Sequence, residues 1–390
     1  MRLTLLLYWG FGVIVQAFLR WAETARPADR AKAAHALARG YLASSVQDEK
    51  RQAAVLALTH LLDDPSPVVR AALAEAVADS PDAPRGMIMS LAEDQPLIAS
   101  SVITRSPVLT DVDLVDLVGR GSVVTRALVA SRPNLSRGIS AAIAEVAGKE
   151  EALLLLENET ASITRFTLRR MAERHGHNAD IRNVLLDRED LTADARHLLV
   201  SHVSEALAAS DLMRTTLTAS RIDYVTREAS EAATVAIAGT VRHHDIAGLV
   251  EHLRQQGRLT PAFLIHVLCG GKVDFFSGAI CNLSGLDDQR VRSILATGRM
   301  HAVRALFEAA GLDRSIANVF VEAVLLWREA ARSPIGFSLQ SICLPLIERF
   351  RAEAQPMSPL AEMLDMIEKL HLMEERLLAR SYAGDLAFAA

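Results

Sequence analysis

The residues whose types and spacing could do chemistry are concentrated between Arg169 and His177. Arg170, Arg174 and His177 follow one another at spacings of four and three, so they share one face of a continuing helix. A face with this much positive charge could bind an anion or an acidic partner. The structural alternative is that these side chains end a helix, because the helix dipole favours cations in a last turn and Gly176 follows.

The histidines and cysteines do not form a convincing metal or nucleophile site. His243 and His244 are adjacent, whereas two histidines of a helical zinc site lie four apart. His266 and Cys269 could be neighbours on a helix, but no orienting carboxylate or oxyanion site accompanies them. The chain also lacks a phosphate-binding glycine loop, a nucleophile elbow and a dinucleotide fingerprint. We therefore expect no metal, no cofactor and no catalytic residue.

Lys272 and Phe275 belong to the most suggestive loop in the second half of the chain. Gly270 and Gly271 let the backbone turn sharply before them, and Phe276 follows directly. Since adjacent aromatic side chains do not point in the same direction, one ring could line a groove or a seam between subdomains. Packing in a core is the plainer interpretation.

Arginine dominates the basic residues, with 37 Arg against 5 Lys. This bias could signal phosphate recognition, although genomic base composition explains it more simply. The net charge of −5 argues against a protein built mainly to hold nucleic acid, so no nucleic-acid partner is expected. The candidate interaction surface therefore combines basic residues with one aromatic ring: Arg126, Arg165, Arg169, Arg170, Arg174, His177, Lys272 and Phe275.

The elements that would hold these residues follow from the composition. Of 390 residues, 50% are hydrophobic and only 5% are aromatic, and Ala (62) and Leu (54) are the commonest types. Both are strong helix formers, which disfavours a β-sandwich or a β-barrel. Three cysteines make no disulfide framework, so a reducing, cytoplasmic compartment is expected.

A turn between Leu61 and Ala74 carries the clearest repeat signal. Ser66 can cap the next helix and Pro67 can occupy its first position, where a missing N–H costs nothing. Val69 and Leu73 then begin an apolar stripe. The turn resembles the inter-helix turn of HEAT repeats, in which an Asp, a Pro and a Val-Arg pair recur.

Weaker copies of this turn follow at irregular spacings, within the range of helix-pair repeats. One copy has Ala99 in place of the Arg, and three others end in an apolar-Thr-Arg sequence at Arg126, Arg165 and Arg227. We expect an all-α fold, an irregular HEAT-like helix-pair solenoid with a C-terminal helical subdomain. The predicted segments are a hydrophobic N-terminal segment (1–20), HEAT-like repeats (21–240), a C-terminal helical subdomain (241–332), and a linker with an amphipathic tail helix (333–390).

The first segment leaves alternatives open. Leu3 to Leu19 is nearly continuous hydrocarbon and reaches the lower length limit of a membrane span. It could anchor the chain in the inner membrane with the repeats in the cytoplasm. A signal peptide fits less well, because Arg2 is the only basic residue before the run. The other alternative is a mis-assigned start or a buried first helix.

Four stretches are distinctive as a set: Leu61–Glu75, Ser106–Leu114, Arg169–His177 and Gly257–Phe276. With them, the chain from about Ala25 to Glu329 resembles a family of uncharacterised bacterial proteins, a domain of unknown function with HEAT-like repeats. The resemblance implies an all-helical repeat fold and brings no known activity. Members tend to begin near the residues matching Phe18 to Trp21, which favours the mis-assigned start.

Stacked helices without a catalytic constellation predict a non-catalytic cytoplasmic scaffold that binds another protein. One alternative is a nucleic-acid-binding or DNA-repair-type enzyme on a HEAT-like fold, which would need a concave stripe of arginines through Arg126, Arg165 and Arg169. The other is a scaffold tethered to the membrane through residues 3–19.

Overall fold

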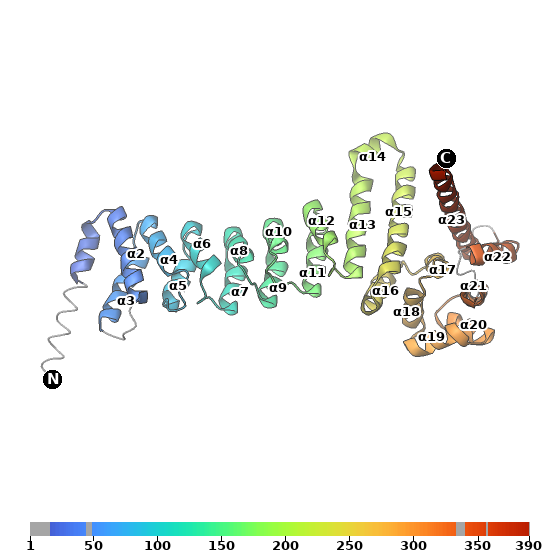
Figure 1. The fold of residues 1–390 in the computed structure, drawn as a ribbon, viewed down its shortest axis with the longest axis horizontal. Helices are drawn as coiled ribbons and strands as arrows, with labels where there is room; N and C mark the ends of the chain where they lie inside the picture. Colours follow the sequence, from blue (N-terminus) through green and yellow to red (C-terminus); the bar gives the residue numbers. More distant parts are fainter. Residues whose placement is uncertain (1–15, 44–48, 333–339, 356–357, 390) are drawn as a thin grey trace. The chain divides into compact units, whose positions relative to one another are not determined.

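The computed structural model describes residues 16–43, 49–332, 340–355 and 358–389, whose secondary structure is helical with no strand among them (Figure 1). The all-α prediction is therefore confirmed. Contacts divide the chain into unit 1, up to Asp190, and unit 2, from Leu191. None of the helices in the described ranges is both long enough and apolar enough to cross a membrane. Most of the predicted segment 1–20, and the start of the segment 333–390, lie outside these ranges.

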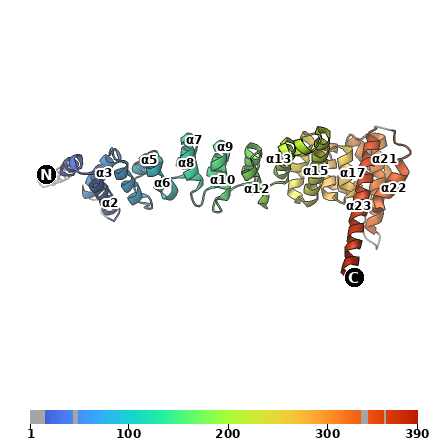
Figure 2. The same cartoon turned by 90° about the horizontal axis from the view of Figure 1, so that it is seen from above.

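The helices of unit 1 alternate between two layers (Figure 2). The even layer, in which each helix packs on the next, contains α2 (Pro27–Ala43), α4 (Pro67–Val77), α6 (Pro96–Arg105), α8 (Val123–Ala130), α10 (Lys149–Glu157) and α12 (Ala179–Asp187). The odd layer contains α3 (Glu49–Leu62), α5 (Arg85–Ala92), α7 (Asp111–Arg120), α9 (Arg137–Val146) and α11 (Arg165–His175). Each helix thus covers the apolar face of a neighbour that it could not bury alone.

The turns of unit 1 show how the sequence starts these short helices. Thr110 and Asp113 form a capping box at α7, in which the Asp113 carboxylate accepts the Thr110 N–H at 2.9 Å. Ser66 stands at the N-cap of α4 before Pro67, as predicted, but its side chain makes no capping bond. Instead, the Ser66 N–H donates to the Asp64 carboxylate at 2.9 Å, which fixes that carboxylate inside the turn.

Unit 2 begins with a helical hairpin of α13 (Ala193–Ala209) and α15 (Ala219–Thr240), joined by α14 (Asp211–Thr216). After the short η1 (His243–Asp245) come α16 (Ile246–Gln255), α17 (Pro261–Cys269), α18 (Val273–Ser284), α19 (Asp288–Thr297), α20 (Met300–Ala309), α21 (Arg314–Arg332), α22 (Gln340–Phe350) and α23 (Pro359–Ala389). The sequence pattern changes near residue 241, but the compact unit begins about fifty residues earlier, because α13 packs on α16 and α15 packs on α17.

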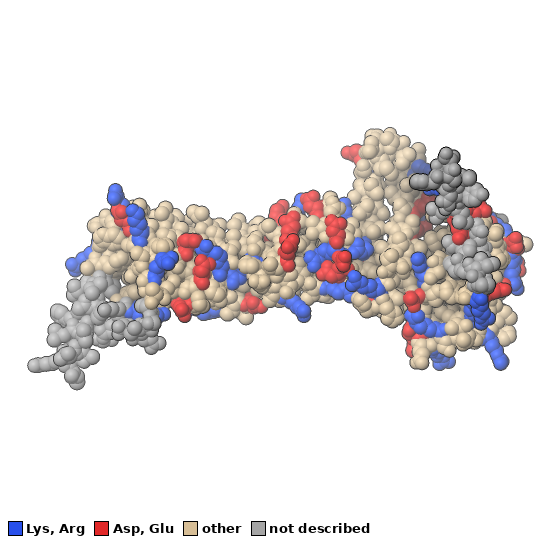
Figure 3. All heavy atoms as spheres, in the orientation of Figure 1, with Lys and Arg blue, Asp and Glu red and all other residues tan. Residues whose placement is uncertain are grey.

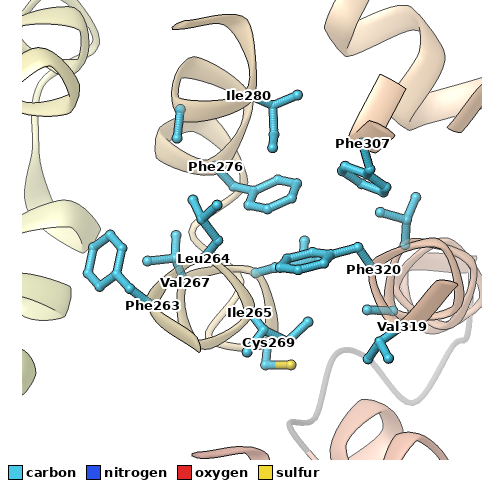
Figure 4. Close-up of a cluster of buried hydrophobic side chains, with 14 of the residues drawn as sticks. Phe263, Leu264, Ile265, Val267, Cys269, Phe276, Ile280, Phe307, Val319 and Phe320 are labelled. Carbon is cyan, nitrogen blue, oxygen red and sulfur yellow. The ribbon is translucent and has the colours of Figure 1, made fainter. Parts of the chain in front are cut away.

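The core of unit 2 is built around α17, which is buried on nearly every side. Such a helix must be apolar all round, and α17 contains the run Phe-Leu-Ile before His266. The aromatic side chains, scarce in the chain as a whole, meet here. Phe276 of α18 stacks on Phe320 at 5.9 Å between ring centroids and lies edge-on to Phe307 at 6.1 Å (Figure 4).

The tail helix α23 packs on α17 and α22. Five of its described residues, spaced along one face, are buried: Leu360, Met363, Leu364, Ile367 and Leu370. This face holds the tail against the rest of unit 2.

Candidate interaction surface

Three arginines of unit 1 occupy the same helical position and bond the same kinds of partner. Arg30, Arg70 and Arg126 are each the fourth residue of an even-layer helix, α2, α4 and α8 respectively. The Nη1 of each donates to a backbone carbonyl five or six residues earlier, at distances between 2.5 and 2.9 Å. Each guanidinium group therefore holds the turn that leads into its own helix.

Nε of each arginine, and Nη2 of Arg30 and Arg70, donate to a carboxylate at or just before the start of the next even-layer helix. Arg30 donates to Asp64 at 2.7 and 2.8 Å, and Arg70 donates to Asp94 at 2.6 and 3.1 Å. A planar fork with five N–H groups can pair with a carboxylate through two parallel bonds while it also bonds a carbonyl, which a lysine ammonium group cannot. We call this repeated arrangement of an arginine, its turn and the next carboxylate the arginine clamp.

The third clamp is the most enclosed on its acidic side. Nε of Arg126 donates to Glu151 at 3.1 Å, and the side chains are 19% and 1% exposed, respectively. Arg126 was predicted as part of an interaction surface from its sequence alone. In the structure its guanidinium group is bonded between α8 and α10.

The first two clamps keep their carboxylates ionised. Burial raises the pKa of Asp64, but the bonds from Arg30 and the Ser66 N–H, with the charge of Arg70, outweigh it and bring the pKa below its usual value. The same balance, with Arg70 as the donor, lowers the pKa of Asp94. Each of these two clamps therefore pairs two full charges and leaves no net charge.

The basic cluster predicted on α11 turns toward α9. Arg170 donates to both oxygens of Glu145 at 2.7 Å, and Arg174 donates to the carbonyls of Ala144 and Ala147 at the end of α9. Because a helix leaves its last carbonyls without partners, a guanidinium group is well placed there. The cluster ties two helices of the odd layer together.

The other predicted residues of unit 1 are also placed by the structure. Nε of Arg165 donates to the carbonyl of Asp190 at 3.3 Å, and Arg169 pairs with Glu173 at 3.1 Å, one turn along the helix. His177 is exposed beyond the end of α11. These arginines bond within unit 1, so they do not make up a stripe of guanidinium groups reserved for phosphates.

Lys272 and Phe275 belong to unit 2. Lys272 stands at the start of α18 with its side chain against Gly239, where an added Cβ would lie 2.6 Å from the lysine Cε. Phe275 is 1% exposed and packs edge-on against Phe263 at 6.0 Å. Since neighbouring residues on a helix point about 100° apart, Phe275 and Phe276 both reach buried surroundings. Phe275 is a core residue, and the suggestion that it lines a surface groove is wrong.

The series of clamps is interrupted at α6, and the surface changes there. The fourth residue of α6 is Ala99, which is buried and cannot bond α8. On the outer face of α6 and α8, the positions spaced three, four and seven residues apart carry no charge. We call them the α6–α8 surface: Leu97, Ser100, Ser101, Thr104, Val124, Ala127, Leu128 and Ser131.

Two apolar side chains project from this surface, since Leu97 is 74% exposed and Val124 is 47% exposed. The hydroxyl groups beside them are already bonded. Ser100 and Thr104 donate to carbonyls of α6, and Ser131 donates to a carbonyl of α8. Covering this surface would therefore remove few free polar groups from water, which keeps the cost of desolvation low.

Charged residues return on both sides of the α6–α8 surface. The corresponding outer positions on α4 end in Glu75, which bonds Arg105, and those on α10 include Glu150 and Glu157. In the space-filling view, the middle of unit 1 shows uncharged side chains between groups of charged ones (Figure 3). The surface is apolar at its centre and acidic toward α10.

Unit 2 contains a buried polar network that sequence spacing did not reveal. Nε2 of His197 lies 3.1 Å from the Thr234 hydroxyl, and Nδ1 lies 3.2 Å from His252. Since Thr234 donates to the Ser230 carbonyl, Nε2 of His197 donates to Thr234. Burial, followed by the charges of His252 and Arg258, lowers the pKa of His197 to about 4. The ring is neutral at pH 7 and braces α13 against α15 and α16.

The pairing of His266 with Cys269 does not produce a nucleophile. A hydrogen bond with Cys343 and complete burial both raise the pKa of the Cys269 thiol. Burial also lowers the pKa of His266, to about 4. Among the described residues, no group of three or more His, Cys, Asp or Glu side chains could hold a metal ion.

Comparison with known proteins gives one match. The chain matches no curated protein and no solved structure. The model of a family described as an uncharacterised protein conserved in bacteria (DUF2336) matches residues 98–369, which include α6 from its third residue, α8 and most of unit 2. This match begins later and ends later than the resemblance over Ala25 to Glu329. Because it covers more than half of the chain, the protein belongs to the DUF2336 family.

Proposed function

We propose that this protein is a non-catalytic scaffold whose HEAT-like helical repeats bind another protein on the α6–α8 surface. The supporting observation is the contrast along the even layer. Where clamps join the helices, the charged side chains bond within unit 1, and where the clamp is missing between α6 and α8, these two helices present uncharged and partly apolar faces. Exposed apolar patches on a protein surface commonly mark interaction sites.

The proposed partner is an amphipathic helix with basic residues beside its apolar stripe. Two parallel rows of side chains form a shallow apolar track, which suits anchors spaced three or four residues apart. Glu150 and Glu157 on α10 would attract basic residues at the edge of that stripe. This proposal places the interaction in unit 1 and away from the basic residues that sequence spacing favoured.

A charged substitution in the track tests the proposal. Val124→Glu puts a carboxylate into the apolar centre and should reduce recovery of the native partner with the tagged full-length protein by at least about tenfold, or about 1.4 kcal/mol. Val112→Glu is the matched control, since Val112 is 71% exposed on α7 of the odd layer. Equal recovery with both variants would refute the proposed surface.

The nucleic-acid alternative has less support from the geometry. Arg126, Arg165 and Arg169 would have to leave bonds within unit 1 to reach phosphates. That alternative predicts retention of DNA or RNA at low salt, with affinity falling steeply as salt rises. We expect no retention.

The membrane-tethered alternative rests on residues 3–19, and fractionation of the native protein with sequencing of its N-terminus tests it.

A further inference from the structure

Unit 2 contains a pocket of about 360 Å³ between α17, α18, α19 and α21. Its walls are mainly apolar and include Leu268, Phe276, Leu295 and Val324. The volume lies within the range of small-molecule sites. Ala296, which lines the pocket, is itself exposed, so the pocket opens to solvent.

The charged part of the wall is entirely basic. Three arginines line the pocket and no acidic residue does. Arg292 is neutralised by Asp274 at 2.7 Å and Asp288 at 2.8 Å. Arg328 and Arg332 lie one turn apart on α21, and neither forms an ion pair with any of the described residues.

Arg328 is fixed in position without forming an ion pair. Its three nitrogens donate to the carbonyls of Ile294, Leu295 and Gly298 at the end of α19, at 2.7 to 2.8 Å. Burial lowers the pKa of its guanidinium group, and the charge of Arg332 lowers it further. Arginine nevertheless stays protonated in proteins. Two like charges without a counter-ion thus stand beside an apolar pocket, an arrangement that an anion would stabilise.

From this geometry we propose that the pocket binds a single-chain amphiphile with an anionic head group, either a carboxylate or a phosphate. The apolar tail packs against Phe276 and Val324, and the head group meets Arg328 and Arg332. The site lies in unit 2, and it is independent of the partner proposed for the α6–α8 surface.

Titration calorimetry of the full-length protein tests this site. Dodecanoate, dodecyl phosphate and dodecanol are compared below their aggregation concentrations. We expect saturable binding of at least one anion at one site, and binding of dodecanol at least about tenfold weaker, which is about 1.4 kcal/mol. Stronger binding of dodecanoate identifies a fatty acid as the source of the ligand, and stronger binding of dodecyl phosphate identifies a phosphorylated lipid.

Three variants separate this site from non-specific adsorption. Ala296→Trp fills the mouth from an exposed position and should abolish binding without lowering the melting temperature. Arg332→Ala should weaken the binding of the anions about tenfold and leave the binding of dodecanol unchanged. Arg290→Ala, an exposed arginine of α19 outside the pocket, is the matched control. The proposal is overturned if neither anion saturates, or if binding survives both Ala296→Trp and Arg332→Ala.

Discussion

The enclosed clamp between α8 and α10 predicts a large and local loss of stability when it is broken. Arg126→Ala leaves the Glu151 carboxylate, 1% exposed, without its charged partner. Removing one partner of a buried pair costs roughly 3–5 kcal/mol. Because the Arg126 side chain is 19% exposed and water can enter the vacated space, we expect the lower end, about 3 kcal/mol.

The assay is hydrogen exchange of the full-length protein, read on peptides of α8 and α10. A loss of about 3 kcal/mol corresponds to amide exchange about a hundredfold faster. In the double variant with Glu151→Gln, no charge is left buried, so about half of the loss should be recovered. Arg120→Ala removes an exposed pair with Asp116 and should change little. A cost below about 1 kcal/mol, or the absence of recovery, would refute the reasoning.

Further predictions concern unit 2 and isolated glycines. The folded pKa of His197, about 4, lies below the ordinary 6.5, so the folded state resists protonation. The free energy of unfolding should therefore fall by about 3 kcal/mol as the pH drops from 6.5 to 4. His197→Asn should flatten this part of the plot of unfolding free energy against pH, and an unchanged plot would contradict the prediction. Gly278→Ala should lower the free energy of unfolding in urea by about 1–3 kcal/mol, because an added Cβ collides with Ile246. Gly86→Ala, where the added Cβ meets open space, should raise it by about 0.5–1 kcal/mol. Equal effects of the two substitutions would contradict this prediction.

Local patterns in the sequence were sufficient to predict the all-α fold class and the turn that precedes α4. The Ser66-Pro67 start of α4 lies where the sequence placed it, and Val69 and Leu73 are buried. These features depend only on helix capping and on the 3.6-residue period. The substitution of Ala99 for arginine was also visible in the sequence, and it marks the missing clamp between α6 and α8.

The use of the arginines could not be read from spacing on one helix. Arg126 resembles Arg165 in sequence, but Arg126 is the fourth residue of α8 and Arg165 is the first residue of α11, so their side chains leave in different directions. Arg30 forms a clamp without the apolar-Thr-Arg sequence. A useful signal would have been an arginine at the fourth position of one even-layer helix together with an acidic residue near the start of the next even-layer helix.

The polar network of unit 2 depends on longer distances in the chain. His197 and His252 are 55 residues apart, and they meet because α13 packs on α16. The same limit applies to Phe275, whose burial follows from the packing of α17 against α18. Such contacts require the three-dimensional arrangement of helices, which periodicity alone does not specify.

The most direct measurement of the interaction surface is site-specific photocrosslinking of the full-length protein in its native host. A photoreactive residue is placed at Leu97 or Val124 on the α6–α8 surface, and at Val112 or Phe166, which are exposed positions of the odd layer. We predict one crosslinked partner shared by positions 97 and 124, absent from positions 112 and 166, and lost when Leu128→Glu is added. Crosslinks of equal yield from all four positions, or only from positions 112 and 166, would contradict the proposed surface.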